Sequence, residues 1–135
     1  MWTFTDGTPQ ELNGKNSTYT FTNPGTYIVT LRVTDPAGND QTSNVTITVH
    51  DVTRPVADAG QNRTVNEDIS ITLDGSASSD NVDVTTFTWT FIDGTSRILN
   101  GEITQYTFNT PGAYTVTLNV TDATGNWATR TRWRK

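Results

Sequence analysis

The sequence predicts an all-β protein built as a β-sandwich, and three observations support this prediction. Apolar residues occupy every second position over several runs, which is typical of strands with one buried face. Turn residues such as Pro-Gly and Gly-Asn separate these runs. Only 33% of the 135 residues are hydrophobic, as expected where alternate strand residues face water. Disorder would also explain a polar composition, but the apolar residues are aromatic or β-branched and keep the alternation.

The alternation is clearest in a stretch that occurs twice. Residues 106–126 read YTFNTPGAYTVTLNVTDATGN, and residues 19–39 read YTFTNPGTYIVTLRVTDPAGN. The segment that begins at Trp89 likewise matches the segment that begins at Trp2, so both pairs of segments are 87 residues apart. A period near 90 residues is too long for a solenoid unit and fits tandem sandwich domains of about 100 residues.

The strands of the later copy can be placed in order from the alternation. Ile69, Ile71 and Leu73 alternate along one strand, and Phe87, Trp89 and Phe91 give the next one a wide aromatic inner face. About seven strands are expected in this copy, near residues 56–58 and 63–65, 69–73, 86–92, 97–99, 103–108, 113–121 and 127–133.

The two copies are not equal. We predict that residues 1–51 form a partial copy that lacks its first strands, and that residues 52–135 form a complete domain. The partial copy would leave one apolar face in water: Trp2, Phe4, Tyr27, Val29, Leu31 and Val33. Each of these side chains is worth about 1.5–3 kcal/mol when buried. Strands from another molecule or the neighbouring repeat would cover them; otherwise the segment is loosely ordered.

The two margins of the sequence depart from the repeat. At the C-terminal end, Arg132 and Arg134 stand where the first copy has Val45 and Ile47, which are inward positions. Because a lone buried arginine is costly, we expect this end to be frayed, re-registered or foreign to the domain. At the other end, Met1 leads directly into strand-like residues without a signal peptide, and we interpret the sequence as an excerpt of a longer protein.

An ordered series of motifs resembles the PKD (polycystic-kidney-disease-type) domain. The motifs are Pro55-Val-Ala-Asp-Ala-Gly60, Leu73-Asp-Gly-Ser76, Phe87-Thr-Trp89-Thr-Phe91, Asp93-Gly94, Pro111-Gly112, Val120-Thr-Asp122 and Gly125-Asn126. They resemble in particular the tandem repeats of archaeal cell-surface and surface-layer proteins. The resemblance implies an immunoglobulin-like β-sandwich with Trp89 as core anchor. It also implies an extracellular or cell-surface setting and a non-catalytic role as spacer, adhesion module or accessory domain of secreted hydrolases.

Charge and composition exclude several functions. The net charge of −5 argues against nucleic acid or anionic membrane as a partner. No apolar run approaches the roughly 20 residues of a membrane helix, and the absence of cysteine removes disulfides and thiolate chemistry. His50 is the single histidine and falls in the connector between the copies, so neither a catalytic triad nor a zinc site is expected. We therefore predict no enzymatic activity, no catalytic residues and no organic cofactor.

Calcium is the sharpest site hypothesis. Asp80 lies in the loop before the strand of Trp89, and Asp122 ends the long strand, so the two loops can meet at one pole of a sandwich. Calcium prefers six to eight oxygen ligands, which turn aspartates and carbonyls supply. The resemblance extends to calcium-binding PKD domains of secreted collagenases. The alternative is that Asp80 and Asp122 only cap turns.

Two further surface features are open to interpretation. Sequons for N-glycosylation occur at Asn16, Asn44, Asn62 and Asn119, although about three are expected by chance in so Asn- and Thr-rich a chain. Trp127 and Trp133 are candidates for stacking on sugars, with packing of the terminal strand as the alternative.

These observations favour a non-catalytic spacer or adhesion module of a larger cell-surface protein. Its expected partners are neighbouring repeats of the same protein, other surface proteins or polysaccharide. The alternative function is an accessory carbohydrate- or substrate-binding module of a secreted hydrolase. An enzyme would need clustered carboxylates in a pocket, and the sequence gives no sign of one.

Overall fold

The computed structural model describes residues 1–134, and the side chains of residues 1–132. The chain divides into two compact units, Met1–Asp51 and Val52–Lys135, which are described separately. Every regular element in the described residues is a β-strand, and all strands pair antiparallel. The predicted all-β, immunoglobulin-like sandwich class is confirmed.

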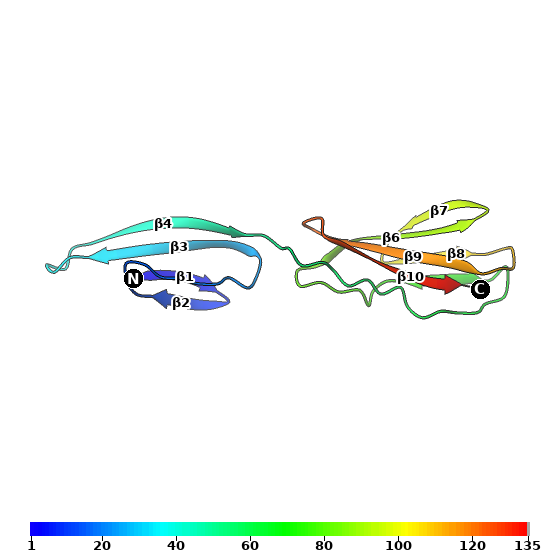
Figure 1. Cartoon of the computed structure of the whole chain (residues 1–135), viewed down its shortest axis with the longest axis horizontal. Helices are drawn as coiled ribbons and strands as arrows, with labels where there is room; N and C mark the ends of the chain where they lie inside the picture. Colours follow the sequence, from blue (N-terminus) through cyan, green and yellow to red (C-terminus); the bar gives the residue numbers. More distant parts are fainter. Residues whose placement is uncertain (135) are drawn as a thin grey trace. The chain divides into compact units, whose positions relative to one another are not determined.

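The first unit is a single four-stranded sheet (Figure 1). Its strands are β1 (Trp2–Asp6), β2 (Thr8–Leu12), β3 (Gly25–Thr34) and β4 (Asp40–Val49), in the order β2-β1-β3-β4. Strands β1 and β2 form a tight hairpin around Gly7, whose φ of 70° favours glycine.

The second unit has two sheets. Strands β6 (Val84–Asp93), β7 (Thr95–Asn100), β9 (Tyr114–Asp122) and β10 (Trp127–Arg134) form the larger sheet in the order β10-β9-β6-β7. Strands β5 (Ser70–Asp74) and β8 (Ile103–Thr107) form a two-stranded sheet. The pairing of β6 with β9 is shifted between Val84 and Thr86, which marks a bulge at the start of β6.

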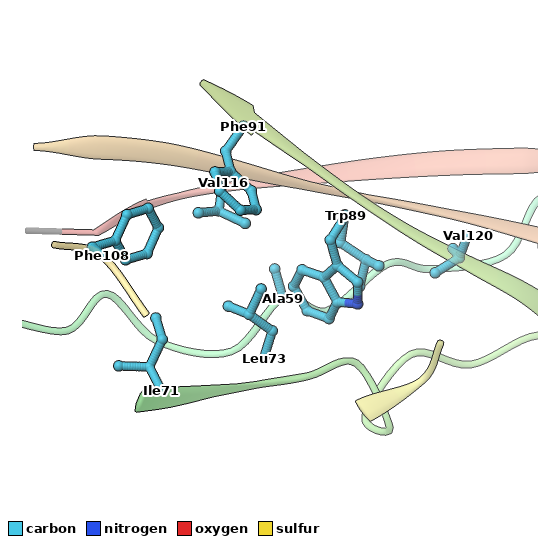
Figure 2. Packing of buried hydrophobic residues seen from close by; sticks show 9 residues of the cluster. Ala59, Ile71, Leu73, Trp89, Phe91, Phe108, Val116 and Val120 are labelled. Atoms are coloured by element: carbon cyan, nitrogen blue, oxygen red, sulfur yellow. The ribbon is translucent and has the colours of Figure 1, made fainter. Parts of the chain in front are cut away.

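The core of the second unit lies between these sheets. Trp89 points inward from β6, Val116 and Val120 point inward from β9, and Ile71 and Leu73 face them from β5 (Figure 2). Leu118 on β9 is also fully buried in this core. The strict alternation along β9 thus predicted its buried face correctly. Trp89 is the largest fully buried side chain and donates its indole N–H to the carbonyl of Gly101 at 3.0 Å.

Side-chain networks are repeated between the two units. The ring centroids of Phe91 and Tyr106 lie 4.7 Å apart, as do those of Phe4 and Tyr19 at the matching positions. Trp2 donates to Gly14 O at 3.0 Å, the counterpart of the bond from Trp89. The sequence repeat is therefore also a repeat of local geometry.

The early part of the second unit differs from our expectation. The segments near 56–58 and 63–65 do not form strands; Val56 makes an isolated bridge with Ser79. The reason is that nearby polar groups bond to side chains: Asp58 N donates to Ser78 Oγ, and Gly60 N donates to the Asp58 carboxylate. Ile69 was also expected to point inward, but it is exposed and precedes β5, after a turn in which Asp68 has a φ of 63°.

The C-terminal strand keeps the register of the repeat, so the expected fraying or change of register is wrong. Arg132 pairs with Val116 just as Val45 pairs with Val29 in the first unit. Its guanidinium is partly buried but has a hydrogen-bond partner, because Nε donates to the carbonyl of Gly60. The side chain of Arg134 lies outside the described residues.

Candidate metal centre

Two loops of the second unit meet where β6 begins and β9 ends. Asp122 is the last residue of β9 and pairs with Val84, the first residue of β6. Asp80 lies four residues before Val84, in the loop that leads into β6. The strand pairing therefore brings the two aspartates predicted from the sequence to the same pole.

Asp122 organises the turn between β9 and β10. Its Oδ1 accepts hydrogen bonds from Thr124 N, Thr124 Oγ1 and Asn126 N, each at 2.9 Å. Its Oδ2 accepts one from Asn126 Nδ2 at 2.9 Å. Burial acts to raise the pKa of Asp122, but the hydrogen bonds from Asn126 and Thr124 outweigh it and lower the pKa to about 2. Only 3% of the residue is exposed, so this turn holds a buried carboxylate anion.

Asp80 is less completely satisfied. Its Oδ2 accepts a hydrogen bond from Val82 N at 3.1 Å, the geometry of a capped turn. Its Oδ1 is buried and accepts no hydrogen bond from the part of the chain that the structure describes. A buried carboxylate oxygen without a donor is costly, and a cation would offset this cost.

Asp51 is the residue that our sequence reasoning missed. It stands directly before the second unit and is only 6% exposed. One carboxylate oxygen each from Asp51, Asp80 and Asp122 lie within 4.8 Å of one another. The sequence does place Asp51 in a short connector next to the predicted pole. The connector sequence alone, however, does not predict that Asp51 is buried.

The donor set fits calcium. Calcium binds oxygen at about 2.3–2.6 Å, so two of its ligands can lie up to about 5 Å apart. Three carboxylates without a histidine or cysteine suit a hard cation and not zinc. Asp83, in the same loop as Asp80, is exposed and does not belong to the group.

The first unit repeats only part of this arrangement. Asp35 is the counterpart of Asp122: Asn39 N donates to its Oδ1 at 2.9 Å, and Asn39 Nδ2 donates to its Oδ2 at 3.0 Å. The side-chain bond from Asn39 is the largest cause of a lowered Asp35 pKa. Asp35 is exposed, however, and the described chain has no counterpart of Asp80 beside it.

The other predicted surface residues lie apart from this pole. Asn16, Asn44 and Asn62 are exposed, as glycosylation would require. Asn119 is on the outward face of β9, but it is half-buried between β6 and β10, with its Oδ1 shielded from solvent. It is therefore the least accessible of the four sequons.

The sugar-stacking candidates are also constrained. Trp127 is half exposed, and the guanidinium carbon of Arg54 lies 5.6 Å from the centre of its ring. The arginine thus occupies one aromatic face through a cation–π contact. The side chain of Trp133 lies outside the described residues.

Comparison with known proteins places these features in a family context. The sequence model of the PKD domain matches residues 1–49 and again residues 52–133. The human dyslexia-associated protein KIAA0319 is 32% identical over 115 residues. That match covers 78% of this chain and 11% of the human protein, so the chain spans about a ninth of that relative's length. No helix among the described residues is both long enough and apolar enough to cross a membrane.

Proposed function

The chain belongs to the PKD domain family, and on that premise we propose that it is a structural spacer and adhesion module of a larger cell-surface protein. PKD domains are non-catalytic modules that are typically extracellular. The observation that carries the proposal is the repetition of one scaffold, with the same aromatic contacts and the same aspartate-capped turn in both units. A repeated scaffold supplies length and exposed strands rather than a reaction centre.

The second unit is suited to bearing tension. Arg132 on the last strand bonds to the carbonyl of Gly60 in the first segment, so the two ends of this unit are tied together. Val56 and Ser79 exchange two backbone hydrogen bonds, at 2.7 and 3.0 Å, which hold the same segment to the loop before β6. Pulling on both ends therefore loads several bonds at once.

Single-molecule stretching tests the spacer function. We expect the second unit, residues 52–135, to unfold in one event that releases roughly 28 nm of chain before the folded length is subtracted. Arg132→Leu should lower the unfolding force because it removes the bond to Gly60, whereas Arg130→Leu, an exposed neighbour on the same strand, should not. Gradual extension without a distinct event would contradict a load-bearing role.

The alternative function, a carbohydrate-binding module, rests on the half-exposed ring of Trp127. Binding on a broad glycan array that is lost in Trp127→Ala would support it in place of the spacer. We expect no such binding, because Arg54 already stacks on that ring.

We further propose that Asp51, Asp80 and Asp122 bind calcium and so rigidify the loops at this pole. The proposal is supported by the close approach of three carboxylates and by the buried Asp80 oxygen that lacks a donor. These residues would supply the oxygen ligands, and the ion would supply a positive charge among them.

Thermal and chemical unfolding with and without chelator test the calcium site. Calcium at ten times its dissociation constant should raise the free energy of unfolding by about 1.4 kcal/mol. Asp80→Asn should abolish this gain, since it removes a charge at the site while its side-chain oxygen can still accept from Val82 N. The matched control Asp83→Asn, exposed in the same loop, should keep it. An unfolding curve that is unchanged by millimolar calcium would refute the site.

A further inference from the structure

The inward face of the first unit is open at one end. Val33 on β3 is 54% exposed, whereas its counterpart Val120 on β9 is fully buried. Leu31 and Trp2 are likewise only half-buried, although the matching Leu118 in the second unit is inaccessible to solvent. These inward side chains of the first unit therefore lack the covering layer that buries their counterparts in the second unit.

The second unit shows what belongs on this face. Leu73 on β5 and Ala59 in the preceding segment are buried against it. Gly75 comes so close that an added Cβ would lie 3.1 Å from Leu118 Cδ2 and 3.3 Å from Trp89 Cζ2. The cover is therefore an extended segment with apolar residues at alternate positions, followed by a glycine at the point of closest approach.

The first unit also has a segment that is not paired in a sheet at the matching place. In the second unit β8 pairs with β5, with Ile71 opposite Tyr106. Residues 16–20 are the counterpart of β8, yet no strand is assigned to them. Strand addition in peptide recognition would pair such a segment with an incoming strand beside the open apolar face.

We propose that the open face of the first unit binds an extended segment with the pattern of residues 69–75, carried by a further repeat of this family. The segment would pair antiparallel with residues 16–20 and place its alternate apolar side chains on Trp2, Leu31 and Val33. The inward residues that the segment would cover, Trp2, Leu31 and Val33, carry no charge, so the inward positions of the segment must be uncharged too. The charged inward residue of β1, Asp6, lies at the other end of that strand and accepts hydrogen bonds from Tyr19 and Tyr27. Residues 70–74 have this character, since Ile71 and Leu73 point inward and Asp74 does not.

A second copy of this chain is the less suitable occupant. Its own residues 59, 71 and 73 are at least nine-tenths buried in its second unit. If these residues moved onto the first unit of another molecule, they would cover its apolar face but expose an equal apolar face in their own second unit. An additional segment closes the face without that loss.

The test fuses a second copy of residues 52–87 ahead of Met1, which restores the spacing of the repeat. Hydrogen exchange is then compared between the fusion and the parent chain. We expect amide exchange in residues 16–20 to slow by at least about tenfold in the fusion. After Trp127 and Trp133 are changed to Phe in both chains, only Trp2 and Trp89 remain. Because Trp89 is already fully buried, a shift of the tryptophan fluorescence to shorter wavelength in the fusion, which we expect, reports the burial of Trp2.

The matched control is the same fusion with Ile71→Asp and Leu73→Asp in the added copy only. It should exchange like the parent chain, because its inward positions are charged. Equal protection in the control, or no protection in either fusion, would overturn the proposal. Protection of residues 16–20 in the parent chain that grows with protein concentration would overturn it in favour of a second copy as occupant.

Discussion

Trp89→Ala is expected to destabilise the second unit by about 3–5 kcal/mol, the range for removing a fully buried aromatic side chain. The indole lies between β6 and the strand that carries Leu73 (Figure 2). It comes so close to Gly75 that a Cβ added there would lie 3.3 Å from Trp89 Cζ2. Its loss also leaves the carbonyl of Gly101 without the 3.0 Å bond from Nε1. Since domains of this size have about 5–15 kcal/mol of stability, the variant should be close to unfolding at room temperature.

Trp2→Ala provides the matched comparison within the same molecule. Trp2 makes the equivalent bond to Gly14 O at 3.0 Å, but its ring is only half-buried. We therefore expect a cost of roughly 1–2 kcal/mol, confined to the first unit. Urea unfolding followed by hydrogen exchange in each unit measures both values. Equal losses of unfolding free energy in the two variants would mean that the deeper burial of Trp89 does not explain its contribution to stability.

The repeat explains why so much of the fold could be predicted from the sequence. Alternation identified the inward face of β9 correctly, because only one register buries Val116, Leu118 and Val120 together. The inward position predicted for Ile69 was wrong because Ile69 continues the alternation of Ile71 and Leu73. The sequence does not indicate that the backbone turns at Asp68, just before β5. Alternation predicts a face, whereas the residue at which a strand begins depends on local backbone geometry.

The candidate site was only partly predictable, for a related reason. Asp122 follows from its position at the end of β9, and Asp80 follows from its position in the loop before β6, where turn aspartates are common. Asp51 has a carboxylate oxygen close to those of Asp80 and Asp122, and their spacing in the sequence does not predict this proximity. Arg132 is a similar case: its cost at an inward position was foreseen, but its carbonyl partner on Gly60 is 72 residues away.

The second large effect is expected from Gly75→Val, which should destabilise the second unit by about 1–3 kcal/mol. A Cβ at this position would lie 3.1 Å from both Leu118 Cδ2 and Phe87 Cδ1. Leu118 and the neighbouring Trp89 are fully buried, so they have no free space into which to move. The φ of Gly75 is not positive, and the cost is therefore one of overpacking and not of backbone strain.

Gly112→Ala is the control that separates these causes. Gly112 also lacks a positive φ, and the nearest atom to an added Cβ is Tyr114 Cε2 at an ordinary 3.9 Å. Replacing such a glycine should leave stability unchanged or raise it by about 0.4–1 kcal/mol, since the unfolded chain loses freedom. Urea midpoints of Gly75→Ala, Gly75→Val and Gly112→Ala make the comparison, and the two Gly75 variants should fall in order of side-chain volume. If Gly75→Val matched Gly112→Ala, the cover over Leu118 would be loose. A segment that binds the first unit would then not need a glycine at the position that corresponds to Gly75.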